Sequence, residues 1–139
     1  MQQIHLPHKG HTLTSIRSIS WFTIVGMVAA AVHYVCAVSL EVGTSITPAY
    51  ANIAGFLVAF PVSYLGHRRF SFSHHDSIHR QALPRFFAVA GLGFTANQLL
   101  VICALRFTPM PFWLALAIVM IVIALSTFIL SRYWAFKST

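Results

Sequence analysis

Two short segments of the chain repeat one pattern, and each contains arginine. Residues 64–72, Tyr-Leu-Gly-His-Arg-Arg-Phe-Ser-Phe, align at an offset of 64 with residues 128–136, Phe-Ile-Leu-Ser-Arg-Tyr-Trp-Ala-Phe. The alignment pairs Arg68 with Arg132, and Arg69 adjoins Arg68. A guanidinium group binds a phosphate through two parallel hydrogen bonds, which a lysine ammonium group cannot do. These arginines are therefore candidate ligands for a lipid phosphate, the alternative being that they only orient the chain in a membrane.

Four polar side chains interrupt segments that are otherwise apolar: His33, Asn52, Asn97 and Gln98. An unpaired polar group that faces lipid costs on the order of a few kcal/mol, so we expect all four to point inward, toward each other or toward water. Polar groups inside a membrane often mark a functional site. They also serve simply as interhelical hydrogen bonds, and the sequence leaves both interpretations open.

The elements that must position these residues are four apolar stretches. Hydrophobic residues make up 58% of the 139 residues and charged residues only 8%, a balance that small soluble domains do not reach. Each stretch is long enough to span about 30 Å of hydrocarbon as a helix. We therefore expect an all-α integral membrane protein with an N-terminal segment at 1–18 and a single four-helix transmembrane domain at 19–134. Its helices are expected at about 19–40, 49–66, 85–105 and 112–131, with a loop at 67–84 and a tail at 135–139.

The repeat extends to the first helix of each pair. Residues 22–26, Phe-Thr-Ile-Val-Gly, match residues 87–91, Phe-Ala-Val-Ala-Gly. A unit of two crossings returns to its starting side, so the two helical hairpins have the same orientation and are expected to be related by a pseudo-two-fold axis along the membrane normal.

Small residues and a proline predict how these helices pack. Gly26 with Ala30, and Gly91 with Thr95, have the four-residue spacing that lets membrane helices approach closely. Pro61 removes a backbone hydrogen bond inside the second helix, so a kink is expected there, which is either static or a hinge.

The distribution of basic residues predicts the topology. Eight of the nine lysines and arginines fall at the two termini or in 67–85, and only Arg106 falls on the other side. This bias predicts cytoplasmic N and C termini and a cytoplasmic 67–84 loop. Because the basic residues flank apolar stretches instead of lining a polar face, the net charge of +7 does not indicate nucleic acid. Cys36 and Cys103 fall near the non-cytoplasmic ends of the first and third expected helices. They are either small packing residues or the two halves of a disulfide.

The sequence does not favour an enzyme. It offers no carboxylate pair or nucleophile–base arrangement, so no catalytic residue and no cofactor are expected. Residues 67–79 contain four histidines and Asp76, but their spacing matches no closed metal site, and we expect a solvated loop there.

Three motifs resemble the GtrA-type family of small four-helix membrane proteins. They are Phe-x-x-Val-Gly at 22–26, Arg-x-Phe-x-Phe at 68–72 and Ser-Arg-Tyr-Trp-Ala-Phe at 131–136, and the resemblance covers about 18–137. Members commonly have Asn before the arginine that follows the second helix, which is Arg68 here. This chain has His67 at that position, so no amide role is carried over to it.

The resemblance implies polysaccharide synthesis at the bacterial cytoplasmic (inner) membrane. It implies that the chain flips a polyprenyl-phosphate-linked sugar, such as one on undecaprenyl phosphate, to the outer leaflet, or else anchors the glycosyltransferase that uses this lipid without transporting it. On the first interpretation Arg68, Arg69 and Arg132 bind the phosphate, while His33, Asn52, Asn97 and Gln98 replace the hydration of the sugar. The expected partners are the lipid-linked sugar, membrane lipids and a glycosyltransferase. A single 15.4 kDa unit encloses little space, so a homodimer or hetero-oligomer is expected.

A small proton-coupled drug exporter is a remote alternative. Such exporters exchange protons for cations at a carboxylate inside the membrane. Here Glu41 lies at the outer end of the first helix and Asp76 in a loop, so His33 would have to titrate in their place.

Overall fold

The computed structural model describes residues 10–71 and 79–135, and within them the side chains of 20–70, 84 and 86–126. The described chain is helical outside its short connections. Its elements are α1 (Gly10–Gly43), α2 (Pro48–Gly66), the π-helical turn η1 (His67–Ser71), α3 (His79–Phe107) and α4 (Phe112–Ala135). The expectation of an all-helical protein with four main helices is confirmed for these residues.

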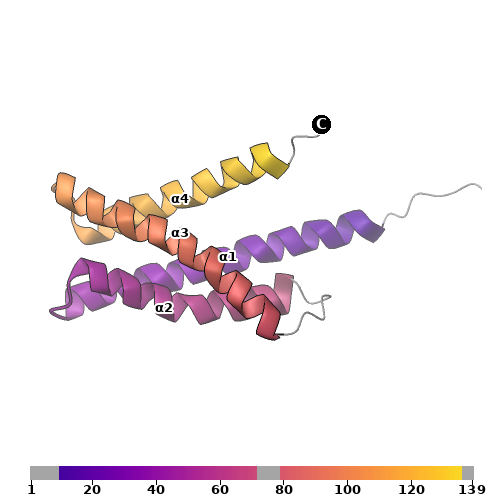
Figure 1. Ribbon diagram of the computed structural model, residues 1–139, viewed down its shortest axis with the longest axis horizontal. Helices are drawn as coiled ribbons and strands as arrows, with labels where there is room; N and C mark the ends of the chain where they lie inside the picture. Colours follow the sequence, from indigo (N-terminus) through magenta and orange to yellow (C-terminus); the bar gives the residue numbers. More distant parts are fainter. Residues whose placement is uncertain (1–9, 72–78, 136–139) are drawn as a thin grey trace, which may run out of the picture.

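The helices run up and down as two hairpins (Figure 1). The connections 44–47 and 108–111 lie at one end of the molecule, here called the loop end. The start of α1, η1, the start of α3 and the end of α4 lie at the other end, here called the η1 end. Arg68 and the last turns of α4, which contain Arg132, therefore share one end. The side chain of Arg132 lies outside the described residues.

The helices form a ring of neighbours. α1 packs against α2, α2 against α3, α3 against α4 and α4 against α1. A two-fold axis parallel to the helices would exchange α1 with α3 and α2 with α4. This exchange turns each pair of neighbouring helices into another neighbouring pair, so the observed order is compatible with such an axis. The hairpins are not equally tight, however, because α1 and α2 pack together more extensively than α3 and α4.

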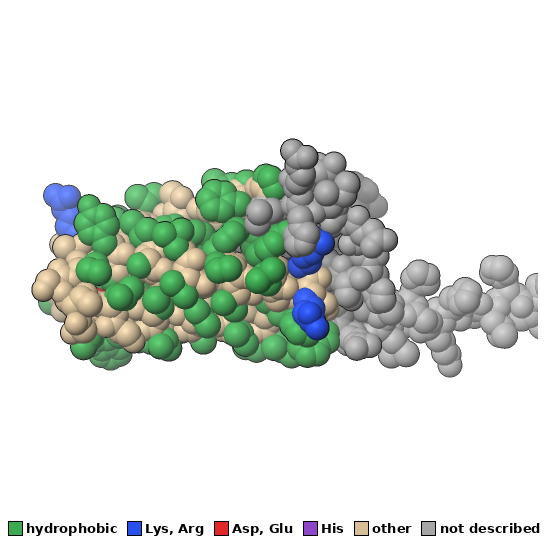
Figure 2. Space-filling view, turned by 90° about the horizontal axis from the view of Figure 1, so that it is seen from below, with side chains coloured by type: hydrophobic (Ala, Val, Ile, Leu, Met, Phe, Trp, Pro, Cys, Tyr) green, Lys and Arg blue, Asp and Glu red, His purple; other side chains and the backbone are tan. Residues whose placement is uncertain are grey.

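Length and composition identify a multi-pass membrane protein. Three segments of the described chain, Ser20–Gly43, Pro48–Phe70 and Phe86–Phe107, are long and apolar enough to cross a membrane. α4 has 24 residues, about 36 Å at about 1.5 Å per residue, and its part with described side chains is apolar from Phe112 to Ser126. On the face shown in Figure 2, hydrophobic side chains cover much of the length, and Lys and Arg side chains lie at its ends.

Two helices extend beyond the apolar windows read from the sequence. α1 begins at Gly10, within the segment expected to precede the first helix, and α3 begins at His79, within the expected loop 67–84. An apolar window marks the part of a helix that matches the hydrocarbon, and the backbone hydrogen bonds of a helix can continue into the polar region beyond it.

Two glycines of α2 bring α1 and α2 into close contact. A Cβ atom at Gly55 would lie 2.7 Å from the carbonyl oxygen of His33, and one at Gly66 would lie 2.6 Å from Cγ1 of Val25. The repeat places Val119 of α4 at the position equivalent to Gly55. The more loosely packed second hairpin thus has valine where the first has glycine, the residue that lets helix backbones approach most closely.

The close helix approach predicted at Gly26 and Gly91 is not found among the described residues. A Cβ atom at Gly26 or Gly91 would meet no described atom within 4 Å, so neither glycine lies at a close contact with the described part of another helix. The hydroxyl of Thr95 instead donates to the carbonyl oxygen of Gly91 in its own helix, at 2.8 Å. Small-residue spacing specifies a helix face, and the tertiary arrangement decides whether that face meets another helix.

The hydrophobic core fills the loop-end half of the bundle. It consists of Ala37, Ala51, Val101, Phe112, Leu116 and Val119. Cys36 and Cys103 are both free thiols. α2 continues as a helix through Pro61, and a hinge at that residue stays a prediction.

Candidate functional site

A hydrogen-bonded network joins three helices where the core ends, with Asn52 of α2 at its centre. Oδ1 of Asn52 accepts from Nε2 of His33 at 2.8 Å. Its amide Nδ2 donates to Oδ1 of Asn97 at 3.0 Å and to Oε1 of Gln98 at 2.7 Å. Nε2 of Gln98 in turn donates to the carbonyl oxygen of Ala49 at 3.1 Å. The four polar residues singled out in the sequence therefore meet at one place, the polar network.

The partners in this network determine the hydrogen positions. Nε2 of His33 faces two acceptors, Oδ1 and the backbone oxygen of Asn52, the second at 3.2 Å. It must carry a hydrogen, which leaves Nδ1 of the neutral ring as an acceptor. Since Asn97 accepts through Oδ1, its Nδ2 is a donor. Both hydrogens of the Asn52 amide are already donated.

Two polar side-chain atoms of the network make no hydrogen bond within the described protein. The hydrogen bonds found for His33 and Asn97 use Nε2 and Oδ1, which leaves Nδ1 of His33 and Nδ2 of Asn97 without a protein partner among the described residues. No buried side-chain nitrogen or oxygen in this part of the chain lacks a partner. The two atoms are therefore not sealed inside the protein.

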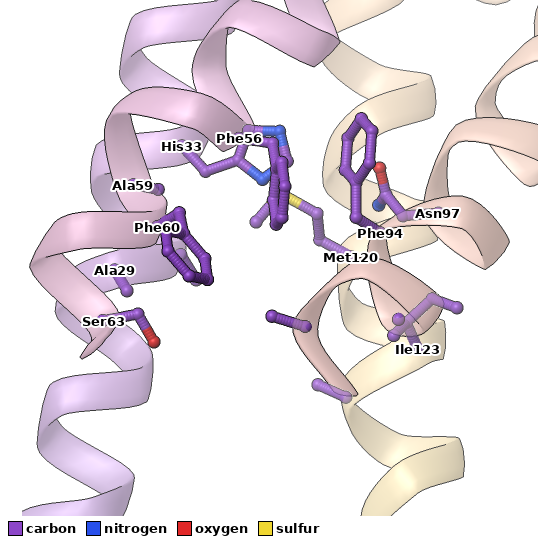
Figure 3. Close-up of a pocket in the computed structure, with 14 residues that line it drawn as sticks. Ala29, His33, Phe56, Ala59, Phe60, Ser63, Phe94, Asn97, Met120 and Ile123 are labelled. Carbon is purple, nitrogen blue, oxygen red and sulfur yellow. The ribbon is translucent and has the colours of Figure 1, made fainter. Parts of the chain in front are cut away.

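These atoms border a groove between the two hairpins with a volume of about 340 Å³ (Figure 3). All four helices line it, and its members include His33 and Asn97 at one end and Ser63 toward the η1 end. Ala30, Gly93 and Ala124 in its lining are exposed, so the groove is open along part of its length. Toward the loop end the polar network and the core close it.

Aromatic rings form one wall of the groove. Phe56 of α2 stacks on Phe94 of α3 with ring centroids 4.2 Å apart and an interplanar angle of 16°. Both rings lie beside the His33 ring, at 6.4 and 6.1 Å. Phe60 lines the groove as well, and beyond the lining the ring contacts continue from Phe60 toward the η1 end through Phe86, Phe87 and Tyr64. The wall therefore presents flat apolar surfaces next to the polar network.

The basic residues lie at the far end of this wall, on a turn with unusual geometry. Arg68 is half-buried and Arg69 exposed on η1. His67, which precedes them, is buried, with its ring 4.4 Å from that of Phe22 and 5.8 Å from that of Phe86. π-helical turns are rare and occur often at functional sites. The aromatic contacts of His67 fix this turn against α1 and α3, and so position both arginines.

The structure divides the predicted site into two places. His33 and Asn97 line the groove, whereas Asn52 and Gln98 lie behind them and orient them. Arg68 and Arg69 lie at the η1 end. The sequence reasoning missed Ser63 and the aromatic wall. The four-residue spacing of Phe56, Phe60 and Tyr64 was the available signal, because such residues share one face of a helix.

Within the described residues no group of three or more His, Cys, Asp or Glu side chains could hold a metal ion. The groove instead combines a hydrogen-bond acceptor, a donor and aromatic faces. These features are suited to binding a molecule that is partly apolar and carries hydroxyl groups.

Comparison with known families gives one match. The family model described as GtrA/DPMS, transmembrane domain, matches residues 21–136, which include every groove residue and both basic segments of the repeat. No curated protein and no solved structure matches the chain.

Proposed function

Because the chain belongs to the GtrA/DPMS transmembrane-domain family, we propose that it moves a polyprenyl-phosphate-linked sugar across the bacterial cytoplasmic membrane. Family membership implies a role in polyprenyl-linked sugar and polysaccharide synthesis, and the membrane domain of this family is generally non-catalytic. Translocation is the step that we add to this role.

The η1 end faces the cytoplasm in this proposal. Eight of the nine lysines and arginines flank the helices on that side in the sequence, and positive residues are retained on the cytoplasmic side of membranes. The groove then extends from the inner leaflet toward the middle of the bilayer. Both termini are cytoplasmic in this orientation.

One observation carries the proposal: a groove with polar atoms at its closed end, inside an otherwise apolar bundle. A sugar that enters a membrane loses water from every hydroxyl, and an unpaired hydroxyl costs on the order of 1–3 kcal/mol on scales from protein mutations. Nδ1 of His33 and Nδ2 of Asn97 replace part of that water. The aromatic wall covers the apolar faces of the sugar ring.

Arg68 and the groove act in succession. Arg68 follows Phe56 by 12 residues, which corresponds to roughly 18 Å along the helix. A phosphate bonded directly to a sugar lies much closer to the ring than that. Arg68, with Arg69 and Arg132, therefore collects the phosphate at the membrane surface, and the headgroup leaves these arginines before its sugar reaches His33.

Reconstitution tests this proposal. Vesicles that contain the protein should move a fluorescent or radiolabelled polyprenyl-phosphate glucose between leaflets faster than vesicles without protein. Asn97→Leu, which removes the groove donor and adds apolar bulk, should lower the rate by about tenfold, the loss expected for one strong hydrogen bond. Thr95→Val, on the exposed face of the same helix, is the matched control.

Equal rates with and without folded protein, across several sugars, would refute translocation. A tight complex with a glycosyltransferase that survives Asn97→Leu, together with normal glycan modification in that variant, would instead support a non-transporting anchor.

A further inference from the structure

We infer that the closed end of the groove selects an uncharged sugar and excludes sugars that carry a carboxylate or an ammonium group. The inference rests on the proposed function and adds the class of sugar to it. It follows from the atoms that the groove presents and from those that it lacks.

The available atoms form an acceptor and a donor. Nδ1 of His33 is an acceptor because Nε2 carries the hydrogen that it donates to Asn52. Nδ2 of Asn97 is a free donor because Oδ1 is the atom that accepts from Asn52. A hydroxyl group both donates and accepts, so a single hydroxyl or two neighbouring ones satisfy this pair. A carboxylate only accepts and an ammonium only donates, so either leaves one of the two atoms unpaired.

Among the described residues, the groove lining contains no charged side chain. None of its residues is Lys, Arg, Asp or Glu, and ten of the fourteen are Ala, Phe, Met or Ile. Arg106, the cation at the loop end, is exposed and lies beyond the buried core. A charged substituent at His33 would therefore lose its water without gaining an opposite charge, which strongly disfavours burial.

The size of the groove favours one sugar ring over several. Its volume of about 340 Å³ is at the low end of the roughly 300–1,000 Å³ found for small-molecule pockets. The stacked pair Phe56 and Phe94 presents a flat surface beside His33, which matches the flat apolar face of a ring.

Three lipids with the same polyprenyl phosphate test the inference in the vesicle assay: one with glucose, one with glucuronic acid and one with glucosamine. The glucose lipid should cross at least about tenfold faster than either charged analogue, because each unpaired buried charge is disfavoured by more than that factor. Photo-crosslinking of each lipid to the full protein in nanodiscs provides a readout of binding that does not depend on transport.

Asn97→Asp is the sharpest variant. Its Oδ1 still accepts from Asn52, so the network and the fold keep that contact, while the donor that faces the groove becomes an acceptor with a negative charge. The preference for glucose over glucosamine should fall by about tenfold or more. Ser45→Asp adds the same charge in the exposed connection 44–47, outside both the groove lining and the polar network, and should not shift the preference toward glucosamine.

The outcomes separate the two proposals. Equal transport of all three lipids would overturn the selection of uncharged sugars and leave translocation standing. Failure of all three lipids to cross or to crosslink would refute the proposed function itself. If Asn97→Asp does not fold, the comparison of the three lipids on the unaltered protein still decides the inference.

Discussion

Asn52→Ala should lower the free energy of unfolding by more than the loss of one interhelical hydrogen bond would. The substitution removes three side-chain hydrogen bonds at once, to His33, Asn97 and Gln98. Hydrogen bonds between membrane helices average about 0.6 kcal/mol each, with a maximum of about 1.7 kcal/mol. Three of them are worth about 2 kcal/mol at the average. The side chain of Asn52 is also wholly buried, so its loss leaves a small cavity that adds to this figure.

The measurement is the free energy of unfolding in lipid bicelles, for example by steric trapping. A loss of about 2–4 kcal/mol is expected, which lowers the equilibrium constant for folding by roughly 30-fold to 1,000-fold. Thr95→Val is the control, since it removes a hydrogen bond made within α3 on the exposed face. A double-mutant cycle of Asn52→Ala with Gln98→Ala should give a coupling energy of about 0.6 kcal/mol or more. A loss below about 0.5 kcal/mol for Asn52→Ala would show that the network does not hold the helices together.

Three further predictions concern packing, phosphate binding and the aromatic wall. Gly55→Ala should cost about 1–3 kcal/mol, because its Cβ would lie 2.7 Å from a backbone oxygen of α1. Gly26→Ala, which meets nothing within 4 Å, should be neutral or stabilising by unfolding in the same bicelles. Arg68→Lys keeps the charge but loses the two-pronged phosphate contact, so transport should fall several-fold, whereas Arg106→Lys at the loop end should transport normally. Phe94→Leu removes a ring stacked at 4.2 Å and should reduce crosslinking of the lipid-linked sugar, while unchanged crosslinking would argue against a role for the wall.

The two halves of the sequence repeat share helix positions in the structure, but the side chains at equivalent positions differ in chemistry. The offset of the repeat predicts two hairpins of one orientation, and the two hairpins run in the same direction in the structure (Figure 1). Asn52 and Leu116 are equivalent in the repeat and both are wholly buried, yet one centres a polar network and the other the core. The repeat therefore preserves positions in the fold while the chemistry at those positions has diverged.

Membrane placement and the presence of a buried polar cluster follow from the sequence alone. Apolar length determines which segments can cross as helices, because a helix satisfies its backbone hydrogen bonds internally in lipid. The cost of an unpaired polar group in lipid favours an inward orientation for His33, Asn52, Asn97 and Gln98. What these residues do in the site depends on partners from different helices, and no local pattern specifies them. Only the tertiary structure decided that Asn52 and Gln98 use their hydrogens within the protein, while Nδ1 of His33 and Nδ2 of Asn97 have no protein partner among the described residues.

The contacts between helices also depend on the tertiary structure and not on the sequence pattern alone. The spacing of small residues pointed to Gly26 and Gly91, and the close approach occurs instead at Gly55 and Gly66. Composition and periodicity describe one helix at a time. Which faces meet is determined by the combined packing of all four helices, because each helix can bury only the faces that its neighbours leave accessible.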